Sequence, residues 1–243
     1  MSGPPWHRER SNGEDGTGQP ADRFLARRLA MVRDQLRRGG IHDEVVLAAF
    51  ERVPRERFVP PDLVERAYAD GALGIGYGQT ISQPLMVAMM TEALAIPSWL
   101  AAHPGQSPLA LDVGTGSGYQ AAILAEVGAR VISIERDERL SSAAAGRLVS
   151  FGYADRITCV VGDGSQGHPE LAPYDAVVVG AAAPAVPPPL VDQLADEGRL
   201  VVPVGPRERQ ELRLVVREGA EFRERWLEAC IFVPLVGRHG FSG

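Results

Sequence analysis

The chain has 243 residues, 45% of them hydrophobic, which is enough to bury the core of one large α/β domain. It carries 31 acidic residues against 25 basic ones, all arginine, and its formal net charge of −6 disfavours a surface for nucleic acid or anionic membranes. We therefore expect a small-molecule or protein substrate, with no nucleic-acid or membrane partner.

Residues 1–20 are rich in glycine, proline and charge and lack the apolar stretch of a secretory signal, so we expect a disordered tail on a cytoplasmic protein. The most apolar stretch, "AVVVGAAAPAVPPPLV", is interrupted by glycine and prolines and does not predict a spanning helix. Cys159 and Cys230 are far apart and lack metal-ligand spacing. We interpret them as buried free thiols and expect no metal.

Residues 21–107 read as helical. An amphipathic helix is predicted from Asp22, as its cap, to the Gly39–Gly40 pair, and shorter helices after Asp43 and over "DLVERAY". The uncharged segment "GYGQTISQP", residues 76–84, is interpreted as a loop before a helix whose first turn contains Pro84. Such a loop delivers its side chains to a helix N-terminus, where an anion is favoured.

Residues 108–243 alternate short β-rich runs with helical stretches. The runs "LALDVG", "RVISIE", "ITCVVG", "DAVVVG" and "RLVVPVG" predict a doubly wound, mostly parallel sheet. Two further runs, "ELRLVVRE" and "ACIFVPL", have no helical pattern between them, so we expect them to form an antiparallel pair at the sheet edge. The predicted organisation is a tail (1–20), a helical annex with a loop (21–107) and an α/β core (108–243).

The first strand of this core runs into the glycine-rich sequence "LDVGTGSGYQ", followed by a helix. Glycines at this place permit a tight turn and a close approach of the backbone to a ligand. Glu135 ends the second strand, 21 positions after Gly114, where a carboxylate can accept hydrogen bonds from ribose hydroxyls. The candidate cofactor contacts of the loop are Asp112, Gly114, Thr115, Gly116, Ser117 and Gly118.

The glycines alone also match the NAD pattern G-x-G-x-x-G/A. Two acids favour S-adenosylmethionine: Asp112 suits a cationic ligand better than a pyrophosphate, and Asp163, followed by Gly164, is placed to accept from an adenine amino group. Each acid has a plain structural alternative. Asp112 can brace the turn, Glu135 can be a solvated strand end, and Asp163 can belong to an ordinary Gly-Asp-Gly turn.

Across residues 22–237 the chain resembles the protein-L-isoaspartate O-methyltransferases. The resemblance is carried by "VPRERFVP", "GYGQTISQP", "LDVGTGSGYQAAILA", "VVGDGSQG", "GRLVVPVG" and "FVPLV", in the family's order. It implies a Rossmann-like class I methyltransferase fold and methyl transfer from S-adenosylmethionine, leaving S-adenosylhomocysteine. The acceptor is the free α-carboxylate of L-isoaspartyl residues in peptides and proteins, whose ester collapses to a succinimide and so begins repair.

A carboxylate with a pKa near 4 is already ionised at neutral pH, so this reaction needs positioning and not a general base. Ser82 matches the family's active-site serine, and we expect it to orient the carboxylate without acting as a covalent nucleophile. The expected substrate contacts are Thr80, Ile81, Ser82, Val233 and Leu235. Alternatively, Ser82 only caps the following helix, and Ile81, Val233 and Leu235 only pack in the core.

Three other functions stay open at this point. The same chemistry can serve one dedicated peptide or another carboxylate, the fold can be that of an NAD-dependent oxidoreductase, or the chain can bind a nucleoside without catalysis. We expect a monomer.

Overall fold

The computed structural model describes residues 20–242, so the predicted tail at 1–19 lies outside the described residues. The chain forms a seven-stranded sheet with the order β5-β4-β3-β6-β7-β8-β9. Strands β3 to β7 pair with one another in parallel, as predicted, whereas β7 and β8 pair antiparallel. The strands are β3 (Leu109–Val113), β4 (Arg130–Glu135), β5 (Ile157–Val161), β6 (Tyr174–Val179), β7 (Leu194–Val204), β8 (Gln210–Glu218) and β9 (Glu221–Cys230).

The strand order reverses between β3 and β6. From β3 the chain continues outward to β4 and β5, and then returns to β6 on the other side of β3. At the carboxyl ends of these two strands, the Gly180 N–H donates to the carbonyl of Val113 at 2.8 Å. A reversal of this kind opens a crevice in which ligands of doubly wound folds bind.

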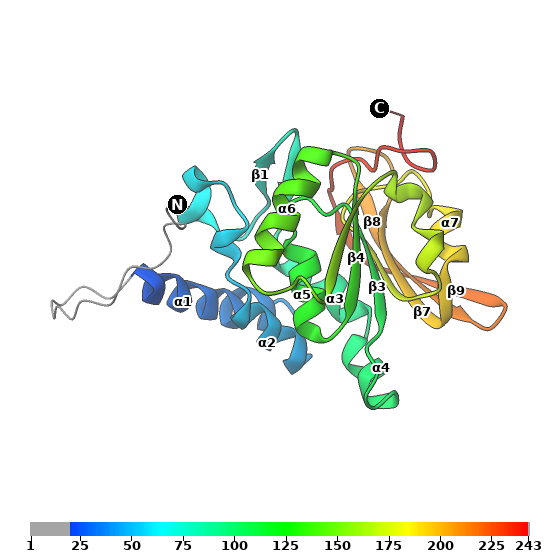
Figure 1. The fold of residues 1–243 in the computed structure, drawn as a ribbon, viewed down its shortest axis with the longest axis horizontal. Helices are drawn as coiled ribbons and strands as arrows, with labels where there is room; N and C mark the ends of the chain where they lie inside the picture. The colour runs from blue at the N-terminus through cyan, green and yellow to red at the C-terminus, as the bar shows by residue number, and fades with distance from the viewer. Residues whose placement is uncertain (1–19, 243) are drawn as a thin grey trace, which may run out of the picture.

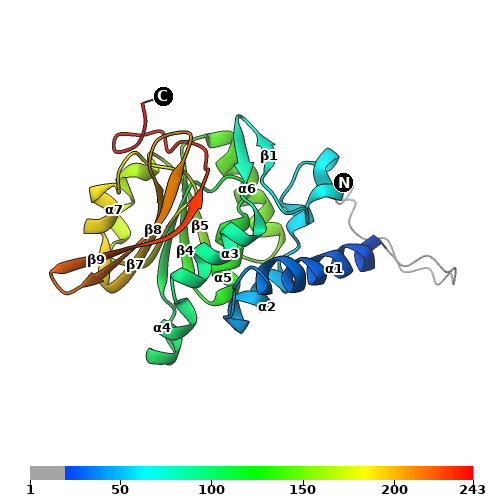
Figure 2. The same ribbon diagram turned by 180° about the vertical axis from the view of Figure 1, so that it is seen from behind.

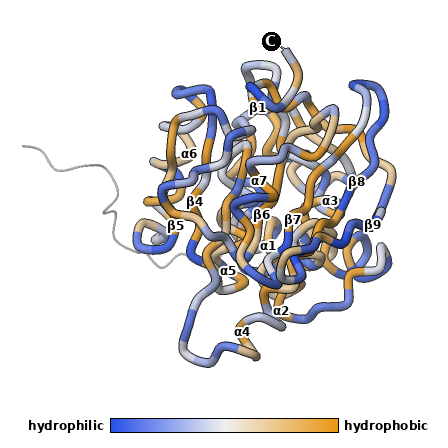
Figure 3. Tube along the Cα trace, turned by 90° about the vertical axis from the view of Figure 1, so that its right-hand side faces the viewer, coloured by the Kyte–Doolittle hydropathy of each residue, from blue (hydrophilic) through white to orange (hydrophobic). Residues whose placement is uncertain are grey.

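Successive residues of the central strands β3, β4 and β6 point to opposite sides of the sheet, and both sides are buried there. Ala110 belongs to a core shared with the N-terminal helices, whereas Leu111 belongs to a core on the other face, which Leu190 helps to close. The hydrophobic strands run through the middle of the molecule (Figure 3). The helices, arranged as in Figures 1 and 2, are α1 (Pro20–Met31), α2 (Glu44–Arg52), α3 (Pro84–Ala93), α4 (Ile96–Ala102), α5 (Tyr119–Val127), α6 (Glu138–Ser150) and α7 (Pro188–Asp192).

The first helices differ from the prediction at their ends. α1 begins at Pro20, so Asp22 lies inside its first turn and not at the cap, and the helix continues as a π-helical segment, Val32–Arg37, up to the predicted glycine stop. α2 follows Asp43, as predicted, and Asp43 caps it, because its carboxylate accepts from the N–H groups of Val45 and Val46. Short 3-10 segments follow at Arg55–Arg57 and Pro61–Arg66, and the second overlaps the stretch "DLVERAY" that was predicted as a helix.

The segment "GYGQTISQP" was wrongly predicted as a loop, since it forms most of a β-hairpin. β1 (Leu73–Gly76) pairs antiparallel with β2 (Gln79–Ile81). The turn has three successive positive φ angles, 92° at Gly76, 53° at Tyr77 and 72° at Gly78, a conformation that glycine adopts without strain. Pro84 then opens α3, as predicted.

Among the described residues, Pro84–Ala102 is the one stretch whose length, 19 residues, and mean hydropathy, 1.5 in an 18-residue window, would allow a helix to cross a membrane. The most apolar stretch considered from the sequence, "AVVVGAAAPAVPPPLV", is a different one. In the structure, Ala95 adopts a left-handed conformation that divides this stretch into α3 and α4. Val87 and Met90 of α3 pack in the same core as the sheet.

The sheet edge is antiparallel, as predicted, but one of the two strands was placed wrongly. β8 pairs with β7 and with β9, and β9 ends at Cys230, so most of "ACIFVPL" follows the strand. This later segment returns to the crevice, where Pro234 forms an isolated bridge with Ala182. Residues 221–226 of β9 are all exposed and four of them are charged.

Candidate active site

The glycine-rich loop lies at the carboxyl end of β3, and its backbone faces the end of β4. The Gly116 N–H donates to Glu135 Oε2 at 3.0 Å, and the Asp137 N–H donates to Oε1 at 3.1 Å. Gly116 has a φ of 50°, and Gly118, with a φ of 86°, precedes α5. The carboxylate is thus held at the loop by two backbone donors, where a ribose can compete for its oxygens.

Asp112 does not face the crevice. It is fully buried, Oδ2 accepts from Ser133 Oγ at 2.7 Å, and Ser133 Oγ lies 2.6 Å from Thr115 Oγ1. Burial raises the pKa of Asp112 to about 7, although the Ser133 hydrogen bond opposes the rise. This placement supports the alternative that Asp112 braces the turn. Its carboxylate holds Ser133, which contacts Thr115 of the loop, and it does not line the crevice.

The crevice holds a narrow cavity of about 70 Å³ beside the glycine-rich loop. It brings together candidate residues from five separate segments of the chain. Most small-molecule sites have volumes of roughly 300 Å³ or more, so this cavity must widen to admit a ligand of that size. The predicted residues that line it are Thr80, Gly114, Gly116, Glu135, Gly164, Val233 and Leu235.

Sequence reasoning missed other cavity residues, among them Gln79, Arg136 and Gly180. A Cβ on Gly180 would lie 3.4 Å from the carbonyl oxygen of Gly114, so small residues at the strand ends leave the crevice open. The signal for Gly180 was the small-residue run after β6. Gln79 and Arg136 had no sequence signal of their own and are notable only as neighbours of the predicted residues Thr80 and Glu135.

Besides Asp112, three residues of the predicted loop set do not line this cavity. Thr115 and Ser117 are buried, and the Ser117 carbonyl accepts from Arg147 Nη1 at 2.6 Å. Gly118 packs close to Leu148, 3.3 Å from where a Cβ would lie. These residues therefore shape the turn and fix the start of α5.

Asp163 lies beside the cavity and not in its wall. Its carboxylate accepts from the N–H groups of Ser165 at 3.0 Å and Arg238 at 2.8 Å, and from Ser165 Oγ at 2.7 Å. Burial acts to raise its pKa, but these hydrogen bonds outweigh it and hold the pKa below the usual value. Asp163 thus connects the C-terminal segment to the loop after β5. Its carboxylate already accepts hydrogen bonds from these donors, so an adenine amino group would have to share the acceptor with them.

A second, wider cavity of about 560 Å³ adjoins the hairpin and contains Ser82. Thr80 lines both cavities, so the hairpin stands between them. The wall opposite the hairpin is built by Glu208, Arg209 and the end of β9. The site therefore has a narrow compartment at the glycine loop and a wide one that can take a peptide.

The remaining candidates divide between site and core. Ile81 is buried in the core, which supports the packing alternative. Gln83 is the N-terminal cap residue of α3 and no side chain caps it, so Ser82 does not cap this helix.

Cys159 and Cys230 are free thiols but only half-buried, contrary to the prediction, and Cys230 lines the wider cavity. Burial raises the pKa of Cys230 to about 11, so this thiol is protonated at neutral pH.

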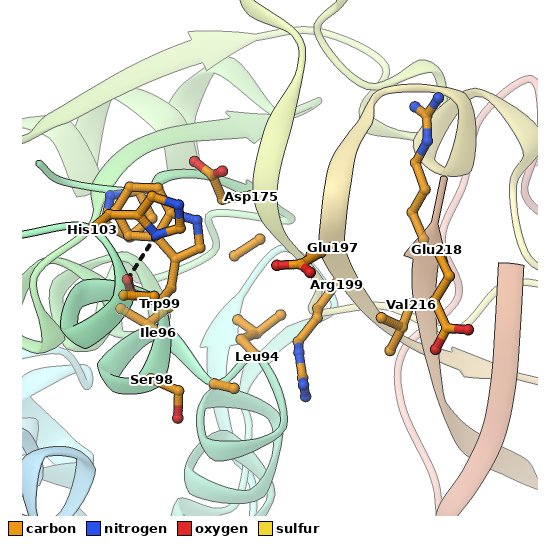
Figure 4. A pocket seen from close by; sticks show the side chains of 15 residues that line it. Leu94, Ile96, Ser98, Trp99, His103, Asp175, Glu197, Arg199, Val216 and Glu218 are labelled. Atoms are coloured by element: carbon orange, nitrogen blue, oxygen red, sulfur yellow. Dashed lines mark hydrogen bonds between the residues drawn. The ribbon is translucent and has the colours of Figure 1, made fainter. Parts of the chain in front are cut away.

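A third cavity, of about 350 Å³, lies at the opposite end of the sheet (Figure 4). Trp99 of α4 stacks there on His103, the residue that follows the helix, with ring centroids 4.1 Å apart, and Arg199 of β7 also lines the cavity. It contains none of the predicted site residues. Among the described residues, no group of three or more His, Cys, Asp or Glu side chains could hold a metal ion.

Comparisons with known proteins agree with this geometry. Residues 26–240 match the family model described as "Protein-L-isoaspartate(D-aspartate) O-methyltransferase (PCMT)". The chain belongs to this methyltransferase family. A protein-L-isoaspartate O-methyltransferase of Methanoculleus marisnigri is 50% identical over 224 residues, which cover 92% of this chain and 97% of that relative. One from Methylorubrum populi is 49% identical over 219 residues, covering 90% and 99%.

Solved structures of the PCMT family share the fold. A protein-L-isoaspartate O-methyltransferase superposes with a TM-score of 0.75 at 25% identity, over 89% of this chain and 67% of the other. A structure from Plasmodium falciparum described as a putative family member in complex with S-adenosyl-L-homocysteine gives a TM-score of 0.73 at 27% identity, over 86% and 98%. The predicted fold class, a Rossmann-like methyltransferase with antiparallel edge strands, is confirmed.

Proposed function

We propose that this chain transfers a methyl group from S-adenosylmethionine to the free α-carboxylate of L-isoaspartyl residues in peptides and proteins, and so begins their repair. One observation carries the proposal. Thr80 lines both the narrow compartment at the glycine loop and the wide compartment that contains Ser82. A donor in the first and a carboxylate in the second would therefore meet at the hairpin, and membership of the family supports this assignment.

The residues present fit S-adenosylmethionine. Glu135 offers a carboxylate at the glycine loop that can accept from ribose hydroxyls, and the glycines of the loop and of the β6 end leave the backbone uncovered. We assign the cofactor contacts to Gly114, Gly116, Glu135 and Gly164, with Asp112 and Asp163 supporting the two loops. The bound cofactor supplies an electrophilic methyl group next to a positively charged sulfur.

The chain's own residues would then position and desolvate the acceptor. An isoaspartyl carboxylate is ionised at neutral pH and needs no proton removed. Ser82 and Thr80 can donate neutral hydrogen bonds that orient it, and placement of two reactants can lower a barrier by roughly 7 kcal/mol. Val233 and Leu235 line the narrow compartment, where their apolar surfaces would exclude water from the reacting atoms.

The test is methyl transfer from labelled S-adenosylmethionine to two synthetic peptides that differ only in L-isoaspartate or L-aspartate at one position. We expect a base-labile ester on the isoaspartyl peptide alone. Transfer to neither peptide, with S-adenosylhomocysteine still bound, would refute this substrate and favour a dedicated carboxylate elsewhere.

A matched pair of serine variants tests the assigned role of Ser82. Ser82→Ala removes the orienting hydroxyl, so we expect kcat to fall by roughly tenfold or more while the affinity for S-adenosylhomocysteine is kept. Ser98→Ala, at an exposed serine of α4, is the control and should leave kcat unchanged. Equal turnover in the two variants would remove Ser82 from the mechanism.

A further inference from the structure

Arg55 is a charged residue in the interior of the protein, fully buried at the start of the 3-10 segment Arg55–Arg57. Its guanidinium joins parts of the chain that are distant in sequence. Nε donates to the carbonyl of Ala67 at 2.8 Å, and Nη2 donates to the carbonyl of Ser82, also at 2.8 Å. The guanidinium carbon also lies 5.0 Å from the centroid of the Tyr119 ring.

This charge is compensated only in part. Arg55 forms no ion pair with any residue of the described chain, 20–242, and its Nη1 has no hydrogen-bond partner there. Burial accordingly lowers its pKa. An apolar side chain of similar volume fills such a site at least as well as an unpaired cation does, so filling space does not explain the arginine.

The Ser82 carbonyl lies at a junction between two elements, where few other hydrogen bonds hold the backbone. Ser82 follows the end of β2 at Ile81 and precedes α3, which begins at Pro84. Proline supplies no N–H to this junction, and the cap residue Gln83 makes no side-chain capping bond. The hydrogen bond from Arg55 is therefore an anchor that fixes the peptide of Ser82 and, with it, the direction of the Ser82 hydroxyl.

The same guanidinium also packs against the helix that follows the glycine-rich loop. Tyr119 is the first residue of α5 and directly follows Gly118 of the glycine-rich loop. Its ring is buried and packs edge-on against Phe58, with centroids 5.4 Å apart. Arg55 thus lies between the peptide group of Ser82 and helix α5, which begins at the glycine-rich loop.

We propose that Arg55 is a positioning residue for methyl transfer, which fixes the Ser82 backbone relative to α5 so that the hydroxyl points at the substrate carboxylate. This inference rests on the proposed function. Arg55 does not contact the substrate, because no atom of its buried side chain lines either compartment. Lysine cannot replace it, since one ammonium cannot reproduce the planar fork that reaches two carbonyls.

The experiment is a double-mutant cycle. Arg55→Lys and Arg55→Met are each made alone and combined with Ser82→Ala, and kcat and KM are measured for the isoaspartyl peptide. Arg57→Lys is the matched control, because Arg57 belongs to the same 3-10 segment and is exposed. Melting temperature and affinity for S-adenosylhomocysteine are measured on every variant. The wild-type chain is assayed first on the peptide pair, so a failure of the proposed function is seen there, before any variant is compared.

We expect both Arg55 variants to lose roughly tenfold to a hundredfold in kcat, as displacements of about 1 Å at a reacting group do, with the affinity for S-adenosylhomocysteine kept. In the Ser82→Ala background the same substitutions should change kcat by less than about twofold, since the group through which Arg55 acts is already absent. Effects that multiply in the double variants would overturn the proposal. So would loss of both cooperative unfolding and S-adenosylhomocysteine binding in the two Arg55 variants, which would assign the arginine to the fold alone.

Discussion

Replacement of Asp112 by asparagine should change how the stability of the protein depends on pH. Burial raises the pKa of Asp112 from 3.8 to about 7, so the folded protein holds this proton more tightly than the unfolded chain does. The stability contributed by the proton is fully present below about pH 4 and is lost as the pH rises to about 7. At 1.36 kcal/mol for each pKa unit, the complete loss is about 4 kcal/mol.

Between pH 5 and pH 8, the wild-type protein should lose about 2 to 3 kcal/mol from this group. Asp112→Asn has no proton to lose, and its side-chain oxygen can still accept from Ser133 Oγ. The free energy of unfolding, measured by urea titration at several pH values, should therefore fall less steeply with pH in the variant. Its stability relative to the wild type should be highest at pH 8.

Asp62→Asn, at an exposed carboxyl, controls for the loss of one negative charge. The titrations of all other groups are common to the wild type and both variants, so the difference between the curves isolates Asp112. Parallel curves for the wild type and Asp112→Asn would refute the reasoning that this buried carboxyl takes up a proton near neutrality.

Three further substitutions test the site. Glu135→Gln should raise the dissociation constant for S-adenosylhomocysteine by about tenfold or more in calorimetry, because a hydrogen bond to a charged acceptor is lost; unchanged binding would exclude the ribose contact. Gly164→Ala would place a Cβ 2.6 Å from Val113 Cγ1 and should cost about 1 to 3 kcal/mol of unfolding free energy, whereas Gly146→Ala in α6, with nothing within 4 Å, should cost nothing. Asp163→Ala should weaken S-adenosylhomocysteine binding and speed amide exchange at the Arg238 N–H, and normal exchange there would contradict the hydrogen bond.

The parallel sheet and the meeting of the glycine loop with Glu135 were predictable, because parallel strands bring their carboxyl ends to one edge. The burial of Asp112 was also within reach. It shares a strand face with Ala110, and a sheet covered by helices on both sides buries both faces. Asp112 was interpreted as a ligand contact because it precedes the glycine-rich loop, although its position in the alternating pattern of β3 indicates a buried side chain.

Other features have no local signal. β1 and β2 have only four and three residues, too few for an alternating pattern to be recognised, so the hairpin looked like a loop. The contacts of Arg55 are to backbone carbonyls 12 and 27 positions away, and a carbonyl is present at every residue. Only the folded chain shows which two carbonyls the guanidinium reaches.

Strand β9 is the last strand on its side of the sheet within residues 20–242, and it exposes Phe222 and Trp226. An enzyme that acts on damaged proteins meets partly unfolded chains, whose extended segments readily pair with a free strand edge and aggregate. Arg223, Glu224 and Arg225 stand along this edge, and an incoming apolar strand would have to bury their charges. Charges along an edge strand therefore oppose the addition of a further strand to this side of the sheet.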